Sequence, residues 1–360
     1  MSFRLIYFKR PLWVWIILLG LGSCSKKDLS VPDSSTASFE NFNLFPGLDK
    51  TQMDLDKRWI SVRVPDSVLS GNPLTAHFTI SPGASLSLNG VSQQSGITKN
   101  NFENELNYTL TAADQHTTQV WIVQATNNDN SLSWGMGQFK KSSISENRSY
   151  NWYIDQSTSG SYALVNCGPS SVTMAIKWAD SSFSKTAQDA RQTYETGGGW
   201  WFTTDIDLYL YKYNIQHAII GLSNEFDSTQ MILTHLLDNH QIIILCLDMD
   251  AVRSAASPAY RVDKFYPTTP GWGHFIVLKG YQKVDEKIFF ETYDPYSFAA
   301  VNPDNTLKGM NRFYRSEDLA RATLAWWNFA FVVAKKGADL DAKTANRKLN
   351  PAHVPVAHNF

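Results

Sequence analysis

The spacing of apolar residues changes near residue 130, and this change limits the folds available to the chain. Between residues 51 and 127, apolar residues occupy every second position in short runs that turn signals separate. Successive side chains of a strand point to opposite faces, so this alternation is typical of half-buried β-strands. The runs lie at 60–64, 74–80, 86–88, 106–110 and 120–122. We expect this part to form a small all-β sandwich.

Beyond residue 130 the pattern indicates helices first and strands afterwards. Helical spacing follows Cys167 and recurs at 186–193 and 228–237, whereas continuous apolar runs occupy 242–247, 275–278, 288–290 and 329–333. This order predicts an α+β domain, and the length of 360 residues is consistent with two domains. The expected boundaries are a signal peptide at 1–23, a tether at 24–50, the β-sandwich at 51–130, the α+β domain at 131–337 and a polar tail at 338–360.

Composition excludes several classes of protein. Lys and Arg total 32 and Asp and Glu total 33, so the net charge of −1 gives no support to a nucleic-acid partner. Three cysteines, Cys24, Cys167 and Cys246, are too few for a disulfide framework. Apart from His235 and His240, no Cys or His pair has metal-ligand spacing, so we expect neither a metal nor a cofactor.

The N-terminus predicts export. Basic residues precede an apolar run at 11–22, which is shorter than the ~20 residues of a membrane-spanning helix but typical of a signal peptide. The run ends in Leu21-Gly22-Ser23-Cys24, which resembles the lipobox of bacterial lipoproteins. That resemblance implies cleavage before Cys24 and lipid attachment to it, while an ordinary secretory signal with a chance cysteine is the alternative. Because Ser25 rather than Asp follows, we expect an outer-membrane anchor in the bacterial envelope, with the membrane face left open.

The strands of the first part resemble the immunoglobulin-like (Ig-like) modules found near the N-terminus of bacterial surface lipoproteins. No residues in this part have catalytic spacing. A role as a spacer and a role in contacting a glycan or protein both remain open for it.

Cys167 is the candidate nucleophile. It precedes Gly168-Pro169, and Pro169 suits a first helical turn because its missing N–H costs nothing there. A helix N-terminus stabilises a thiolate, and its free N–H groups can receive an oxyanion.

A thiolate nucleophile needs a base and a group that orients the base. His274 opens a predicted strand, and Asp294 ends the next one. If the two strands form a hairpin centred on residue 284, His274 and Asp294 are cross-strand neighbours with Cβ atoms ~4.5–5.5 Å apart. A register slip of one residue would break this pairing.

These three blocks resemble papain-like cysteine peptidases, and more narrowly the C39-like relatives. The resemblance rests on Asn166-Cys167-Gly168-Pro169-Ser170-Ser171, on Gly273-His274 with the apolar residues that follow, and on Asp294-Pro295, and it covers about residues 145–335. It implies that Cys167 is the nucleophile, His274 the general base and acid, and Asp294 the orienting group. The family places an oxyanion-hole Gln about six residues before the Cys, where this chain has Ser161. The nearest Gln upstream is Gln156, which is our candidate.

Other residues have alternative interpretations. Cys246 lies in a continuous apolar run, which favours a packing role, although a disulfide with Cys167 would abolish the mechanism. Gly198, Gly199, Trp200 and Trp201, together with Trp272, are candidates for a substrate cleft. The alternative is a surface turn whose two Trp side chains pack on the core.

The sequence thus predicts a lipid-anchored cysteine peptidase that hydrolyses a peptide or protein substrate. Two alternatives remain: an amide transferase or deamidase that uses the same residues, and a surface adhesion or binding lipoprotein with a vestigial triad. Each residue of the triad, taken alone, also suits a purely structural role.

Overall fold

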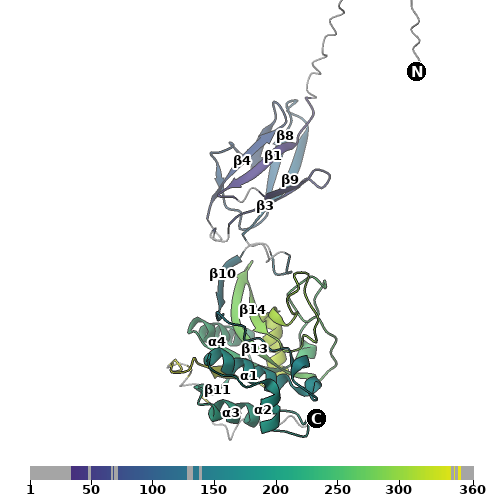
Figure 1. The fold of residues 1–360 in the computed structure, drawn as a ribbon. Coiled ribbons are helices and arrows are strands. Elements are labelled where there is room, and N and C mark those ends of the chain that lie inside the picture. Colours follow the sequence, from purple (N-terminus) through teal and green to yellow (C-terminus); the bar gives the residue numbers. More distant parts are fainter. Residues whose placement is uncertain are drawn as a thin grey trace, which may run out of the picture.

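The computed structural model describes residues 34–341, except 48–49, 66–67, 69–71, 128–132 and 138–139, together with 344, 348 and 349. Figure 1 shows two separate units along the chain, one of strands only and one of mixed helices and strands. The signal peptide and Cys24 lie outside the described residues. Among the residues that are described, no helix is both long and apolar enough to cross a membrane.

Two sheets make up the first unit. One has the strand order β1-β4-β7 and the other the order β2-β3-β9-β8-β5-β6, in which β3 and β9 run parallel. The strands are β1 (Phe39–Phe45), β2 (Lys50–Asp54), β3 (Trp59–Arg63), β4 (Leu74–Ile80), β5 (Ser85–Leu88), β6 (Val91–Ser92), β7 (Lys99–Asn100), β8 (Leu106–Thr111) and β9 (Thr118–Thr126).

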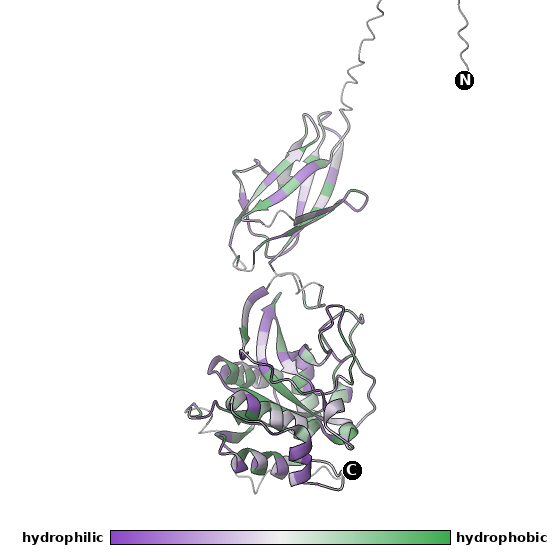
Figure 2. Ribbon diagram, in the orientation of Figure 1, coloured by the Kyte–Doolittle hydropathy of each residue, from purple (hydrophilic) through white to green (hydrophobic). Residues whose placement is uncertain are grey.

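One apolar core joins the two sheets. Hydrophobic and hydrophilic residues alternate along several of these strands in Figure 2, as half-buried strands require. Phe42 of β1 and Tyr108 of β8 are both buried, and their ring centroids lie 6.0 Å apart across the core. Ile60 and Val62 of β3 are also fully buried. The predicted alternation therefore corresponds to two sheets packed face to face.

Strand β1 corrects the expected tether at 24–50. Residues 39–45 pair antiparallel with β4, and Phe39, Phe42 and Leu44 are buried in the core. A register shift between Phe39 and Asn41 interrupts the alternation of this strand. The apolar positions 39, 42 and 44 therefore do not follow a period of two, which hid the strand from the sequence pattern.

The second unit is built on an antiparallel sheet of seven strands. The order is β11-β16-β12-β13-β14-β15, and β10 pairs with β13 beside this path. Its strands are β10 (Lys140–Ser145), β11 (His217–Gly221), β12 (Ile242–Asp248), β13 (Gly273–Val284), β14 (Lys287–Tyr293), β15 (Met310–Arg315) and β16 (Phe329–Val333). Its helices are η1 (Gln156–Thr158), η2 (Ala163–Val165), α1 (Cys167–Ala179), α2 (Ala187–Thr193), α3 (Thr203–Lys212), α4 (Phe226–Asp238), η3 (Met249–Ala251) and α5 (Ser316–Ala325).

Helices cover both faces of this sheet, which explains why β12 is apolar without interruption. Ile242, Ile244 and Cys246 belong to the same core cluster as α1 and α3. Ile243, Leu245 and Leu247 belong to the cluster of α4 and α5. Alternate residues of one strand therefore pack against different helices, and Cys246 faces the helix that begins with Cys167.

The β13–β14 hairpin corrects the expected register. Val284 pairs with Lys287, so the turn is the two residues Asp285 and Glu286, both with positive φ. This is the geometry of a tight hairpin turn that matches the strand twist. A bulge between Leu278 and Gly280 shifts the register again, and the ladder ends at Val277–Tyr293. His274 and Asp294 are therefore not cross-strand partners.

The expected polar tail is partly packed. Leu349 donates its backbone N–H to the carbonyl of Ile219 in β11, and its side chain packs on the core that contains α1. Thr344 is also buried. These contacts place residues 344 and 349 against the α+β unit.

Candidate active site

Cys167 is the first residue of α1 and is buried. Pro169 lies in the first turn, as predicted. Gly168 is needed because Trp201 packs directly on this turn: a Cβ on Gly168 would lie 2.8 Å from the Cβ of Trp201. Ser171 ties the next turn to β13 by donating to the carbonyl of Phe275 at 3.1 Å. The helix N-terminus is therefore fixed against the strand that carries His274.

Asn166 and Arg191 hold the segment before Cys167. The Nε of Arg191 donates to Oδ1 of Asn166 at 2.7 Å, and its Nη2 donates to the carbonyl of Val165 at 3.0 Å. Asn166 in turn donates to the backbone carbonyl and the hydroxyl of Ser159. Both side chains are buried, so this network fixes the loop that leads into the nucleophile.

His274 is the second residue of β13 and pairs with Leu247 of β12. Its Nε2 hydrogen-bonds to Oδ1 of Asp294 at 2.8 Å. Its side chain also interacts with Cys167, each shifting the other's pKa, and because Nε2 is taken by Asp294, Nδ1 is the ring nitrogen left for the sulfur. The structure thus brings Cys167, His274 and Asp294 together in the order nucleophile, imidazole, carboxylate.

Asp294 reaches His274 although it lies beyond the end of the β13–β14 ladder. Its backbone N–H donates to the carbonyl of Gly309 at 2.9 Å, and its own carbonyl accepts a 2.8 Å hydrogen bond from the Tyr153 hydroxyl. The carboxylate is completely buried. Anchoring of the backbone just past the strand end, rather than cross-strand pairing, brings the carboxylate to the imidazole.

The three groups shift one another's pKa values. Burial acts to raise the pKa of the Cys167 thiol, but the hydrogen bond and charge of His274 outweigh it and lower that pKa below its usual value. Burial disfavours the charged imidazole, yet the Asp294 carboxylate and Cys167 raise the pKa of His274 to about 10. Burial likewise opposes ionisation of Asp294, and attraction to His274 lowers its pKa. All three shifts therefore act in the direction of a thiolate–imidazolium pair beside an ionised carboxylate.

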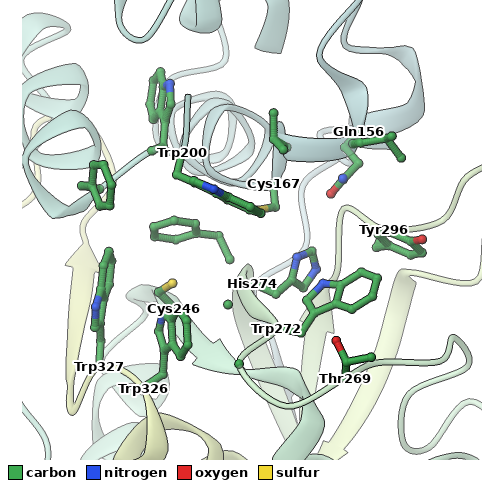
Figure 3. A pocket seen from close by; sticks show the side chains of 17 residues that line it. Gln156, Cys167, Trp200, Cys246, Thr269, Trp272, His274, Tyr296, Trp326 and Trp327 are labelled. Carbon is green, nitrogen blue, oxygen red and sulfur yellow. The ribbon is translucent and has the colours of Figure 1, made fainter. Parts of the chain in front are cut away.

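Gln156 lies in the wall of the same cavity. Its backbone N–H donates to the carbonyl of Pro295 at 2.8 Å, and its amide Nε2 donates to the carbonyl of Ala163 at 2.9 Å. The buried amide oxygen has no hydrogen-bond partner. In Figure 3 the amide end points towards Cys167 and His274. Gln156 is therefore in reach of the site, with one donor hydrogen committed to Ala163.

A cavity of about 300 Å³ opens beside Cys167 and His274. In Figure 3 Cys167, His274 and Gln156 lie on one side, and Trp326, Trp327 and Cys246 on the other. Trp200, Trp201 and Trp272 also line it. Trp200 is half exposed, whereas Trp201 is buried in the core. Trp201 thus combines both roles that the sequence left open, cleft wall and core residue.

Gly198 and Gly199 do not line this cavity within the described part of the chain. Gly198 has a φ of +87°, and a Cβ there would lie 2.4 Å from the Tyr162 ring. The carbonyl of Gly199 accepts a 2.6 Å hydrogen bond from Arg191. These glycines shape the loop that presents the two Trp residues.

Cys246 is a buried free thiol that also lines the cavity, a position the sequence pattern did not indicate. Burial and the nearby Cys167 raise the pKa of Cys246 well above its usual value. The two cysteines therefore differ in ionisation although both face the same space.

Sequence reasoning missed several residues of the site. Tyr266 and Tyr314 donate hydrogen bonds to Asp294, while Tyr296, Trp326 and Trp327 line the cavity. Tyr314 lies in a strand and Trp326 at the end of a helix, where aromatic residues are ordinary core residues, so no local signal marked them. Among the described residues, no group of three or more His, Cys, Asp or Glu side chains is arranged to hold a metal ion.

The family comparison matches the α+β unit. Residues 148–320, nearly half of the chain, match the Peptidase_C39 like family. The match includes Cys167, His274 and Asp294, so this region is similar to C39-like peptidases. No curated protein matches the chain.

Solved structures give weaker similarities. A candidate C39-like peptidase from Bacillus anthracis aligns with 11% identity and a TM-score of 0.37, covering 54% of this chain and 98% of its own. A candidate secreted protein from Bacteroides fragilis aligns with 16% identity and a TM-score of 0.20, covering 26% and 98%. A candidate glycoside hydrolase from Bacteroides thetaiotaomicron aligns with 12% identity and a TM-score of 0.23, covering 84% and 90%. These scores are too low to assign a function.

Proposed function

Starting from this similarity to C39-like peptidases, we propose that this chain is a cysteine peptidase in which Cys167, His274 and Asp294 form the catalytic triad. The observation that carries the proposal is the chain of contacts from the sulfur at a helix N-terminus to a buried imidazole and on to a buried carboxylate. The cavity beside these groups gives a substrate access to the sulfur.

The reaction follows from the protonation states of the site. The Cys167 thiolate attacks the carbonyl carbon of a peptide amide, and the carbonyl oxygen takes the negative charge. When the C–N bond breaks, the imidazolium of His274 gives its proton to the leaving amine. His274 then removes a proton from water, which attacks the acyl-enzyme and releases the acid and the thiolate. Asp294 holds the ring in the tautomer and orientation that both proton transfers need.

The oxyanion is assigned to the N-terminus of α1. The first N–H groups of a helix have no intrahelical acceptor, so those of Cys167 and its neighbours can receive the oxyanion. Gln156, whose side chain lines the same cavity, would be a second donor through the Nε2 hydrogen that Ala163 does not accept. Loss of one such donor costs ~10²–10³ in turnover, which is the loss we expect for Gln156→Ala.

The location of the enzyme is also a proposal. The apolar run at 11–22 and the Leu21-Gly22-Ser23-Cys24 motif support cleavage before Cys24 and a lipid anchor in the bacterial outer membrane. The first unit, for which the sequence resembles an Ig-like module, would then lie between the anchor and the peptidase domain. Its predicted role is that of a spacer.

The direct experiment compares peptide-library cleavage by the wild-type protein with cleavage by Cys167→Ala and Cys167→Ser. We expect the wild type to cleave a subset of peptides and both variants to cleave none, since neither replacement supplies a thiolate. Products that carry the amine of a second peptide in place of water would identify an amide transferase. Absence of both hydrolysis and transfer in the wild type would contradict the peptidase proposal.

A further inference from the structure

The Asp294 carboxylate accepts four hydrogen bonds, two on each oxygen. His274 Nε2 and the backbone N–H of Tyr296 lie 2.8 and 2.9 Å from Oδ1. The hydroxyls of Tyr266 and Tyr314 lie 2.8 and 2.6 Å from Oδ2. Tyr266 is 5% exposed and Tyr314 is fully buried. Each oxygen of this buried carboxylate therefore accepts two hydrogen bonds. Both donors to Oδ2, the oxygen that does not contact His274, are phenol hydroxyls.

Phenols suit this position because they remain donors over the whole working pH range. Burial, together with the charge of Asp294, raises the pKa values of Tyr266 and Tyr314 well above the usual value. Hydrogen bonds to an ionised oxygen are short and strong. Without them, Oδ2 would be a buried charged atom with no partner, which is costly.

The two tyrosines come from separate parts of the fold. Tyr314 is in β15, where it pairs with Phe290 of β14. Tyr266 is in the loop that precedes β13, and its ring lies 4.4 Å from Tyr296 and 6.1 Å from the His274 ring between centroids. Tyr266 therefore both donates to the carboxylate and contacts the imidazole edge-on. One donor lies in a strand and the other in a loop, and together they fix the orientation of the carboxylate plane.

We propose that Tyr266 and Tyr314 are positioning residues for catalysis: their hydroxyls hold Asp294 ionised and oriented so that Oδ1 stays on His274. This inference rests on the proposed peptidase function. A carboxylate that loses both donors on Oδ2 takes up a proton or turns away from the ring. Either change removes the negative charge that keeps His274 protonated, so the pKa of His274 falls.

Among the described residues, the other charged and titratable groups near Asp294 do not donate hydrogen bonds to its carboxylate. The buried guanidinium of Arg312 lies nearby on β15, but it donates to the backbone carbonyls of Tyr260, Val262 and Asp263. Tyr153 contacts the backbone carbonyl of Asp294 and not its carboxylate. Cys167 acts on Asp294 only through His274. The phenol hydroxyls are therefore the groups whose removal changes the carboxylate directly.

The test is the pH profile of Cys167 alkylation in the full chain, measured by peptide mapping after brief exposure to iodoacetamide. The variants are Tyr266→Phe, Tyr314→Phe and the double variant, which keep the rings and remove only the hydroxyls. Tyr281→Phe is the matched control, since it removes a Tyr–Asp hydrogen bond to Asp238 at the surface. Each profile is normalised to its own maximum, so the amount of folded protein does not affect it.

We expect the alkaline limb of the kcat/KM profile, which reports His274 deprotonation, to move down by about one pH unit or more in the double variant, and the plateau of the alkylation profile to begin at higher pH. The single variants should move less and Tyr281→Phe should not move. In the peptidase assay, kcat should fall with little change in KM. If Tyr314→Phe does not fold, Tyr266→Phe from the loop carries the test alone.

Two results would overturn the proposal. A folded double variant whose profile superimposes on that of the wild type would make the tyrosines merely structural, and an upward shift of the limb would contradict the assigned direction. If the wild type itself shows no thiolate plateau, the triad fails together with the proposed function. If the wild type and the double variant show the same plateau, only the proposed role of the tyrosines is contradicted.

Discussion

The imidazole of His274 lies between two groups that carry negative charge in the reactive state. Cys167 and Asp294 both raise its pKa, to about 10, against the opposing effect of burial. The same contacts lower the pKa of Cys167. A thiolate–imidazolium pair therefore exists from the lowered pKa of the thiol up to the raised pKa of His274, and activity should be high across that interval.

Replacement of Asp294 by Asn tests this interval from its alkaline side. Removal of the carboxylate charge lowers the pKa of His274, since an opposite charge at this distance contributes about 1–3 pH units. We expect the alkaline limb of kcat/KM to move to lower pH by that amount. The measurement is a pH–rate profile of Asp294→Asn beside the wild type. An unchanged alkaline limb would mean that Asp294 does not set the charge of His274.

For individual residues, the local structure predicted at Cys167 and His274 is observed, whereas the register used to select Asp294 is not. Cys167 and His274 were found from a helix start and a strand start, and both positions are observed. The hairpin register that led to Asp294 was wrong, yet the carboxylate meets the imidazole because the chain is anchored just beyond the ladder. Tyr266 and Tyr314 gave no signal, since a tyrosine that donates to a buried carboxylate has the same sequence context as one that only packs.

Helix α1 depends on a close approach of Trp201 to its first turn. In Gly168→Ala the new Cβ would meet the Trp201 Cβ at 2.8 Å, so either the helix start or the Trp must move. Overpacking of this kind typically costs about 1–3 kcal/mol, and we expect that loss in the free energy of unfolding together with slower Cys167 alkylation. Gly197→Ala is the control, because no atom lies within 4 Å of its Cβ position. Equal stability of the two variants in denaturant titrations would contradict this packing.

Strand β1 should be a core element of the first unit. Phe42 is buried and Phe45 of the same strand is 66% exposed. Truncation of a buried Phe typically costs about 3–5 kcal/mol. We therefore expect Phe42→Ala to lower the unfolding midpoint strongly and Phe45→Ala to change it little. Similar midpoints for both variants would restore the tether interpretation.

Elements with strong periodicity were predicted well, and those without it were missed. Strand β16 and helix α4 match the apolar runs that predicted them closely. Helix α5 follows β15 without an intervening loop, so one element hid the start of the next. Strand β11 was not predicted, and it pairs antiparallel with β16 at the edge of the sheet.

At the scale of the whole molecule, the described residues form one core cluster in the first unit and three in the second. The core of the first unit contains residues from β1 to β9, and the triad lies at the edge of a core in the second. Residues 51–130 were predicted as an all-β sandwich from the alternation between 51 and 127, and 148–320 match the C39-like peptidase family. The apolar periodicity predicts the strands of the first unit but not its role, because a spacer and a binding module can have the same pattern of strands.

The proposed anchor is tested in cells. We expect Cys24→Ala to abolish metabolic labelling of the protein with a radioactive fatty acid and to release it from the membrane fraction. The reason is the Leu21-Gly22-Ser23-Cys24 motif, which supports Cys24 as the residue that carries the proposed lipid. Cys246→Ala is the control that removes a cysteine without touching the motif. Labelling that persists in Cys24→Ala would contradict the lipobox assignment.

The rate of Cys167 alkylation as a function of pH, in the wild type and in His274→Ala, tests the central claim most directly. The account predicts that wild-type Cys167 reacts at a plateau rate well below the pH of an ordinary thiol's ionisation, ~8.5, and faster than Cys246. In His274→Ala the plateau should vanish and the rate should rise only towards alkaline pH. A wild-type Cys167 that titrates like an ordinary thiol, with no change in His274→Ala, would contradict the account.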